Sequence, residues 1–168
     1  MSYLELLASR CRGVASVLAA TAASPPPDLP GARGAGLRWL VTGIGASEGP
    51  ARFLVHLLRT ELGLRARFAP LSSFLPERDA PPADALVIFS QGLSPNARLA
   101  LERASAYERA LLVTGLEPDA HAPPASPART LADYQARGLG IWCHPPPSED
   151  GLLLRVQGPA AATLTAYR

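Results

Sequence analysis

The first stretch of the sequence that could do chemistry is GIGAS at Gly43–Ser47, which follows the apolar run Trp39–Val41 and precedes an amphipathic segment. A glycine loop between a strand and a helix presents free backbone N–H groups and a helix N-terminus to an anion. Gly43 and Gly45 can adopt positive φ and place no side chain between the backbone and a ligand. Ser47 stands where an N-cap or a phosphate-binding hydroxyl belongs. The same glycines would also serve a tight turn with close helix–sheet packing.

A second polar loop follows the longest apolar strand candidate of the chain. That candidate is DALVIF at Asp84–Phe89, and the loop is SQGLSPN at Ser90–Asn96. The side chains of Ser90, Gln91 and Ser94, together with backbone N–H groups, could surround a phosphate with neutral donors. The N-termini of the following helices would add partial positive charge. Ser94 could equally be the N-cap of the next helix, and the two roles are compatible.

The composition excludes several kinds of chemistry and partner. All 16 basic residues are Arg, so Schiff-base chemistry and a Walker-type phosphate lysine are excluded. A net charge of +2 with scattered arginines argues against nucleic-acid binding, and no run approaches the ~20 apolar residues of a membrane span. Two cysteines, Cys11 and Cys143, are typical of a reduced protein and cannot form a zinc site alone. We expect a cytoplasmic protein with no metal, nucleic-acid or membrane partner.

The N-terminal region divides into a helix and a connector. Residues 2–23 predict an amphipathic packing helix, because one face collects the apolar residues Leu4, Leu7, Cys11, Val14 and Leu18. The alternative is a signal peptide, which the early Glu5 and the weakly apolar centre disfavour. Residues 24–36 are a proline- and glycine-rich connector. The ligand-binding domain is then expected over 37–168.

Short apolar runs alternate with helical patterns through this domain. The pattern predicts strands at 37–42, 64–68, 84–89, 110–114 and 139–144, and helices at 48–62, after Pro95, at 129–137 and at 160–167, with 151–156 as either a strand or a helix start. Such alternation is typical of right-handed βαβ units in a doubly wound parallel sheet. Ligands on these sheets bind beyond the carboxyl ends of the strands, where the strand order reverses. Both polar loops fall at such ends.

A dinucleotide cofactor fits these loops poorly. The Rossmann fingerprint requires GxGxxG and an acidic residue about twenty positions later. The third glycine of GIGASEG comes one residue late, and the second strand ends in Arg67, Phe68 and Ala69 without a carboxylate. We therefore expect no bound cofactor.

Taken together, GIGASEGPA, the LSSF turn, DALVIFSQGLSPNA and ALLVTG resemble the SIS (sugar isomerase) domain family over roughly residues 37–116. The resemblance implies a three-layer αβα sandwich with a five-stranded parallel, flavodoxin-like sheet that binds a phosphosugar. Proteins with this domain include aldose–ketose isomerases, the sugar-binding half of glutamine–fructose-6-phosphate transaminase and sugar-phosphate-sensing regulators. The implied ligand-binding residues are Gly43, Gly45, Ser47, Ser90, Gln91, Gly92 and Ser94.

The second loop departs from the family pattern. Against the family's SQSGET, this chain has SQGLS, which is one residue shorter and lacks the middle serine. A phosphate donor is lost unless a backbone N–H of Gly92 or Leu93 replaces it. This departure weakens the implied ligand class.

Isomerisation would require a general base to move a proton between two carbons. His144 and Glu149 are the candidates, because they lie at the end of the fifth predicted strand, although Pro145–Pro147 would equally make this a rigid solvated turn. In the double-domain enzymes that the chain resembles, such residues come largely from later helices or from a neighbouring subunit.

Two functions therefore stay open. One is an isomerase-type subunit, or half of a two-domain protein, that binds a sugar phosphate. The other is a non-catalytic sensing or structural SIS module. We expect a homodimer, or a pairing with a second SIS-like chain, in which residues 2–20 and 158–168 contribute contacts.

Overall fold

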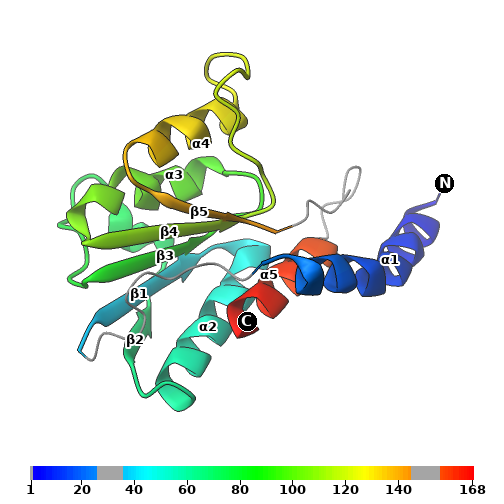
Figure 1. Cartoon of the computed structure of the whole chain (residues 1–168), viewed down its shortest axis with the longest axis horizontal. Helices are drawn as coiled ribbons and strands as arrows, with labels where there is room; N and C mark the ends of the chain where they lie inside the picture. Colours follow the sequence, from blue (N-terminus) through cyan, green and yellow to red (C-terminus); the bar gives the residue numbers. More distant parts are fainter. Residues whose placement is uncertain (1, 26–35, 145–155) are drawn as a thin grey trace.

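Five parallel strands form one sheet that has helices on both faces (Figure 1). The computed structural model describes residues 2–25, 36–144 and 156–168. The strand order is β2-β1-β3-β4-β5, which is the flavodoxin-like order. The predicted three-layer αβα sandwich is confirmed. The strands are β1 (Arg38–Gly43), β2 (Arg65–Phe68), β3 (Ala85–Phe89), β4 (Arg109–Thr114) and β5 (Gly140–Cys143).

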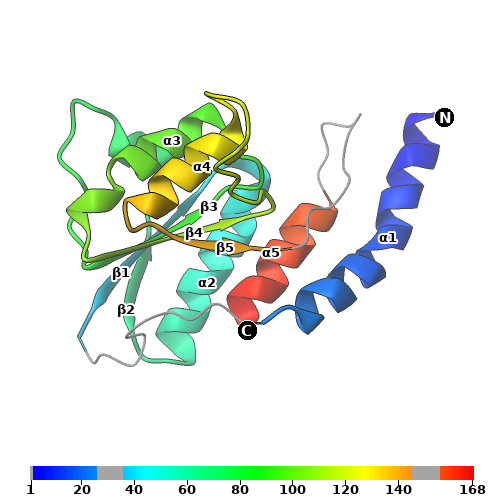
Figure 2. The ribbon, with the colours of Figure 1, turned by 45° about the horizontal axis from the view of Figure 1, so that its top comes forward.

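The helices form the two outer layers. Helices α2 (Glu48–Thr60) and α5 (Gln157–Tyr167) lie on one side of the sheet, and α3 (Pro95–Glu102) and α4 (Pro127–Ala136) lie on the other (Figure 1). Helix α1 (Tyr3–Ala23) packs on α5 and runs outward, so that its N-terminal end lies far from the sheet (Figure 2). Single turns of 3₁₀-helix occur at Gly45–Ser47, Leu71–Phe74 and Ala104–Ala106. None of the helices in the described ranges is long and apolar enough to cross a membrane.

The core consists of two layers separated by the sheet. Every residue of β3 is buried, as expected for a central parallel strand that is covered on both faces. Leu40, Leu86 and Ile88 pack toward α3 and α4. Val41 and Val87, one position along on their strands, pack toward α2 and α5. The alternation of strand side chains thus supplies both cores from the same apolar runs.

The boundaries of α2 and α4 differ from the predicted ones. Helix α2 ends two residues before the predicted position, because Gly63 has φ +64° and turns the chain, leaving Leu62 60% exposed. Helix α4 begins two residues earlier than predicted. Ser126 caps it by accepting a hydrogen bond from the Arg129 N–H (3.3 Å), and Pro127 occupies the first turn, where proline is favoured.

The predicted N-terminal helix is present, but its buried face is rotated from the predicted one. The side toward α5 carries Arg10 and Thr21, which are the buried residues of α1, whereas Leu4 and Cys11 are exposed. The side chain of Gln157 fills the space beside Gly13 and donates from Nε2 to the Arg10 carbonyl oxygen (2.9 Å). A glycine and a buried amide thus join the two helices.

We expect Leu40→Ala to lower the free energy of unfolding by about 2–5 kcal/mol, because Leu40 is fully buried and the surrounding core cannot collapse around the cavity. Leu62→Ala is the matched control. Its side chain is 60% exposed, so we expect a change within about 0.5 kcal/mol. Urea denaturation followed by circular dichroism measures both. Equal effects of the two substitutions would contradict this description of the core.

Candidate functional site

The two polar loops lie side by side at the carboxyl edge of the sheet. Strands β1 and β3 are parallel neighbours, with Gly43 opposite Phe89 at their ends. From these ends the chain leads into α2 on one face and α3 on the other (Figure 2). The position between the two strand ends is therefore the topological switch point, the usual ligand position on a doubly wound sheet.

The glycines of the first loop have two different roles. Gly45 has φ +58°, as predicted, and begins the 3₁₀ turn Gly45–Ser47. Gly43 does not have positive φ, so the prediction is wrong for this residue. Instead, a Cβ atom at Gly43 would lie 2.5 Å from the Ser47 carbonyl oxygen. Gly43 is needed because the backbone folds back closely over it.

Ser47 does not cap α2, contrary to one of its two predicted roles. Its backbone is already helical (φ −87°, ψ −10°), and its hydroxyl makes no capping hydrogen bond, because side-chain capping requires an extended residue. Ser47 is buried, with 8% of its surface exposed. The N–H groups of Gly45 and Ala46 donate to no acceptor within the described residues. The first loop thus has backbone donors available to a ligand.

The second loop is held by its two serines and a buried leucine. The Ser90 hydroxyl accepts from the Ser94 N–H (3.4 Å), and the Ser94 hydroxyl accepts from the Ala97 N–H (3.3 Å). The predicted N-cap at Ser94 is confirmed. Leu93 has φ +55° and is 3% exposed, with its side chain in the core. The N–H groups of Gly92 and Leu93 find no acceptor in the described part of the chain.

Gln91 connects the second loop to β4 and α5. Its carbonyl oxygen accepts from the Gly115 N–H and the Thr114 hydroxyl, both at 3.1 Å. Its side-chain amide packs directly on Gly158, where a Cβ would come within 2.2 Å of Nε2. Nε2 is buried and has no acceptor among the described residues. The amide group is therefore positioned with an unused donor.

Two threonines at strand ends were not singled out from the sequence as site residues. Thr114 is fully buried at the end of β4 and binds Gln91. Thr42, near the end of β1, is also fully buried, and its Oγ1 has no partner within the described ranges. The available signal was a hydroxyl residue closing an apolar strand, in RWLVTG and in RALLVT. The Thr114 hydroxyl thus holds the second loop, and the Thr42 hydroxyl is buried one residue before Gly43.

His144 lies against the second loop and is not part of a solvated turn. It is 1% exposed, and its N–H donates to the Thr114 carbonyl oxygen (2.9 Å). Its imidazole packs on Gly115, where a Cβ would lie 3.0 Å from Cε1. The other candidate base, Glu149, lies outside the described residues. Burial, with a smaller contribution from Glu117, raises the pKa of the nearby Cys143 thiol, which disfavours a thiolate nucleophile there.

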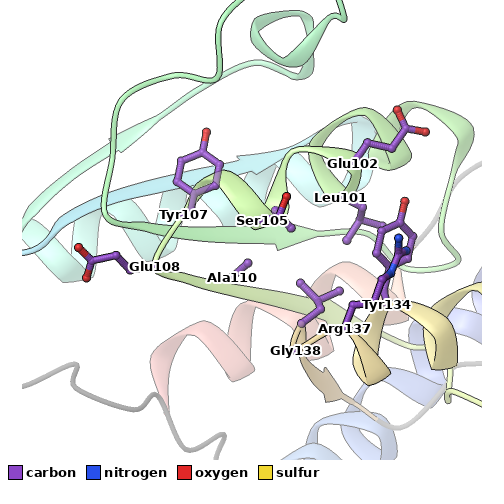
Figure 3. A pocket seen from close by; sticks show the side chains of 11 residues that line it. Leu101, Glu102, Ser105, Tyr107, Glu108, Ala110, Tyr134, Arg137 and Gly138 are labelled. Carbon is purple, nitrogen blue, oxygen red and sulfur yellow. The ribbon is translucent and has the colours of Figure 1, made fainter.

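A separate pocket of about 450 Å³ lies at the opposite, amino edge of the sheet (Figure 3). Its polar lining includes Glu102, Glu108 and Arg137, and the Arg137 guanidinium stacks on Tyr134 with 4.4 Å from Cζ to the ring centroid. None of the residues predicted to bind a ligand lines this pocket. No group of three or more potential metal ligands occurs in the described residues.

The fold is shared with solved sugar-phosphate proteins. The C-terminal domain of glucosamine-fructose-6-phosphate aminotransferase from Francisella tularensis matches 97% of this chain with a TM-score of 0.59 and 12% identity. A protein assigned as a sugar-phosphate isomerase from Listeria monocytogenes matches 99% with a TM-score of 0.58 and 16% identity. One assigned as a phosphosugar isomerase involved in capsule formation from Bacteroides fragilis matches 99% with a TM-score of 0.57 and 13% identity.

These likenesses establish the fold, a phosphosugar-isomerase-like αβα sandwich. The chain spans 45% of the aminotransferase domain, but 87% and 86% of the Listeria and Bacteroides proteins. No protein-family model matches the sequence. No curated protein matches it either.

We expect Gly43→Ala to destabilise the protein and distort the first loop, because the added Cβ would lie 2.5 Å from a backbone oxygen. The matched control is Gly49→Ala, on the exposed first turn of α2, where an added Cβ meets nothing within 4 Å. Replacing a helical glycine by alanine is expected to stabilise by about 0.4–1 kcal/mol. Thermal denaturation of both variants measures the difference. A Gly43→Ala protein as stable as the Gly49→Ala protein would contradict the close approach.

Proposed function

We propose that this chain binds a phosphorylated sugar at the Gly43–Ser47 and Ser90–Ser94 loops, as a subunit or half of a sugar-phosphate isomerase-type protein. The observation that carries the proposal is the grouping of unused donors at the switch point. Backbone N–H groups of both loops have no acceptor within the described residues, and the hydroxyls of Ser47 and Ser90 lie at the same edge of the sheet.

A phosphate suits this arrangement because its oxygens accept several hydrogen bonds at once. Neither loop contains an arginine, so the charge would be balanced by neutral donors and by the N-termini of α2 and α3. The missing serine of the second loop leaves the N–H groups of Gly92 and Leu93 as its replacements. The positive φ of Leu93, fixed by its buried side chain, holds that part of the loop in place.

Names of the structural neighbours support the same ligand class. Two are assigned as sugar-phosphate or phosphosugar isomerases, and the aminotransferase is named for a hexose phosphate. The shared fold supplies the switch point but no particular sugar. The local donors of this chain therefore carry the argument for a phosphorylated ligand.

Catalysis by this chain would require a base that reaches the sugar carbons. His144 is the described candidate, because it lies behind Gly115 at the second loop. Its 1% exposure favours the second candidate function, a sugar-phosphate-binding module that does not turn the ligand over. A turnover assay with hexose and pentose phosphates separates the two. Activity that is lost in His144→Gln with binding retained supports an isomerase, whereas binding without turnover supports a sensing or structural module.

The predicted effect of Ser47→Ala or Ser90→Ala is a loss of about 1.5–3 kcal/mol in sugar-phosphate binding, since each substitution removes one hydrogen bond to a charged ligand. Ser105→Ala is the matched control, because Ser105 is exposed at the opposite edge of the sheet. A thermal-shift screen against hexose, pentose and amino-sugar phosphates, followed by calorimetry, measures the loss. Unchanged affinity in the double Ser47→Ala/Ser90→Ala variant would refute the proposed site.

The same proposal includes assembly through the terminal helices. Three large side chains at their ends are exposed: Tyr3 by 56%, Leu4 by 73% and Tyr167 by 70%. Helix α1 packs on α5, and most of its residues remain at least partly exposed. Apolar faces of this kind commonly form interfaces, and two-fold dimers are the commonest closed assemblies.

We therefore expect light scattering at tens of micromolar to give twice the 17.6 kDa mass of the chain, or a complex with a second SIS-like chain. The double variant Leu4→Glu/Tyr167→Glu should be monomeric, because formation of the dimer would bury the two introduced carboxylates in the interface. Leu62→Glu is the control, since Leu62 is 60% exposed but lies after α2. A parent protein that is monomeric alone and with SIS-like partners would contradict the proposed assembly.

A further inference from the structure

A second pocket, rich in positive charge, lies at the amino edge of the sheet. This edge is opposite the Gly43–Ser47 and Ser90–Ser94 loops, which are called the serine loops below. The pocket has a volume of about 480 Å³ and lies beside the first residues of β1 and β2. Four arginines line it: Arg38, Arg59, Arg65 and Arg67. Three come from the strands, and Arg59 comes from the last turn of α2.

Only part of this positive charge is balanced by the protein. Arg38 pairs with Asp84 (2.8 Å), and hydrogen bonds from the Arg38 side chain and backbone hold the pKa of Asp84 at about 2. Arg67 donates to the neutral Pro82 carbonyl oxygen (3.3 Å). Arg59 and Arg65 form no ion pair with any described residue. Three guanidinium groups beside one pocket, those of Arg59, Arg65 and Arg67, therefore lack a counterion in the described structure.

A tryptophan in the lining of the pocket carries a buried indole N–H that is unsatisfied within the described structure. Trp39 lines the pocket and is 4% exposed, and its Nε1 is buried without an acceptor among the described residues. The other indole, Trp142, donates to the Pro25 carbonyl oxygen at 3.3 Å. A buried donor without a partner destabilises the fold unless something else accepts its hydrogen bond. An anionic ligand would provide acceptor oxygens for the exposed arginines, with the Trp39 ring forming part of the pocket lining.

The pocket in Figure 3 serves as an internal comparison. It lies at the same edge of the sheet and has a similar size, but its lining includes the carboxylates Glu102 and Glu108 beside Arg137 (Figure 3). Two carboxylates and one guanidinium give this lining a net negative formal charge, opposite to that of the pocket at β1 and β2. The lining of the pocket at β1 and β2 has no carboxylate.

We propose that the pocket lined by Trp39, Arg59 and Arg65 binds a small phosphorylated ligand at a site separate from the serine loops. The planar fork of arginine matches phosphate oxygens, and the pocket has the volume of a small-molecule site. Arginines on the edge strand β2 also discourage pairing with other sheets. That role does not account for Arg59, which is on a helix.

The test uses the chain of 168 residues with inorganic pyrophosphate as the probe, measured by titration calorimetry. The double variant Ser47→Ala/Ser90→Ala serves as the background. It weakens pyrophosphate binding at the serine loops, so that the binding that remains reports on the arginine pocket. In that background, pyrophosphate is expected to bind, and Arg59→Gln and Arg65→Gln are each expected to weaken binding about tenfold, since each removes a charge-assisted contact. Arg137→Gln, which removes a charge from the pocket of Figure 3, is expected to leave the affinity unchanged.

A second measurement follows the pocket directly. In the variant Trp142→Phe, the remaining indole is Trp39, and its fluorescence is expected to change on addition of pyrophosphate. Loss of all binding in the serine-loop variant would overturn the separate site while supporting the sugar-phosphate proposal. Equal weakening by Arg59→Gln and Arg137→Gln, or binding of an acidic peptide in place of pyrophosphate, would also overturn it. Circular dichroism checks that each variant is folded.

Discussion

The parallel pairing of β1 with β3 is the constraint on which the candidate site depends. Because the two strands run in the same direction, their carboxyl ends meet, and the loops that follow must lie side by side at one edge of the sheet. The helices after them pack on opposite faces, and the start of α5 packs beside the second loop through Gly158 and Gln91. The close approach of the backbone over Gly43 then brings the first turn of α2 against the end of β1. A residue with a side chain at Gly43 would displace the loop that offers the backbone donors.

The sequence was sufficient to predict the layers, because each buried strand is a continuous apolar run between glycine or proline loops. It was also sufficient for the cap of α3, since serine before proline has few other local uses. The role of Ser47 was not predictable in the same way. Whether the Ser47 hydroxyl caps the helix depends on the backbone conformation of Ser47 itself. That conformation is set by the 3₁₀ turn Gly45–Ser47, which the sequence alone did not predict. The buried face of α1 was predicted wrongly because α1 contacts α5 through Gly13 and Arg10. Hydropathy alone does not predict that a glycine and an arginine are on a buried face.

The shortened second loop illustrates how a lost side chain can be offset by backbone geometry. Leu93 lies in the left-handed region, which is unfavourable for a residue with a branched side chain. Burial of that side chain in the core offsets the cost. Gln91 is also fixed in place. Its carbonyl oxygen accepts hydrogen bonds from Thr114 and Gly115, and its side-chain amide packs on Gly158. Preorganised donors of this kind need little rearrangement on binding, which limits the entropy cost of ordering a loop.

The two edges of the sheet differ in the way they can attract an anion. At the carboxyl edge the donors are neutral and partly buried, so binding there would depend on geometry and on the helix N-termini, whose effect falls off within one turn. At the amino edge β1, β2 and β4 each begin with an arginine, and these exposed charges act over a longer range but are screened by salt. Because the chain has no lysine, every basic side chain at neutral pH is an arginine, and neither loop at the carboxyl edge contains one. The formal positive charge at the strand starts and the neutral donors of the loops are thereby kept at opposite edges of the sheet.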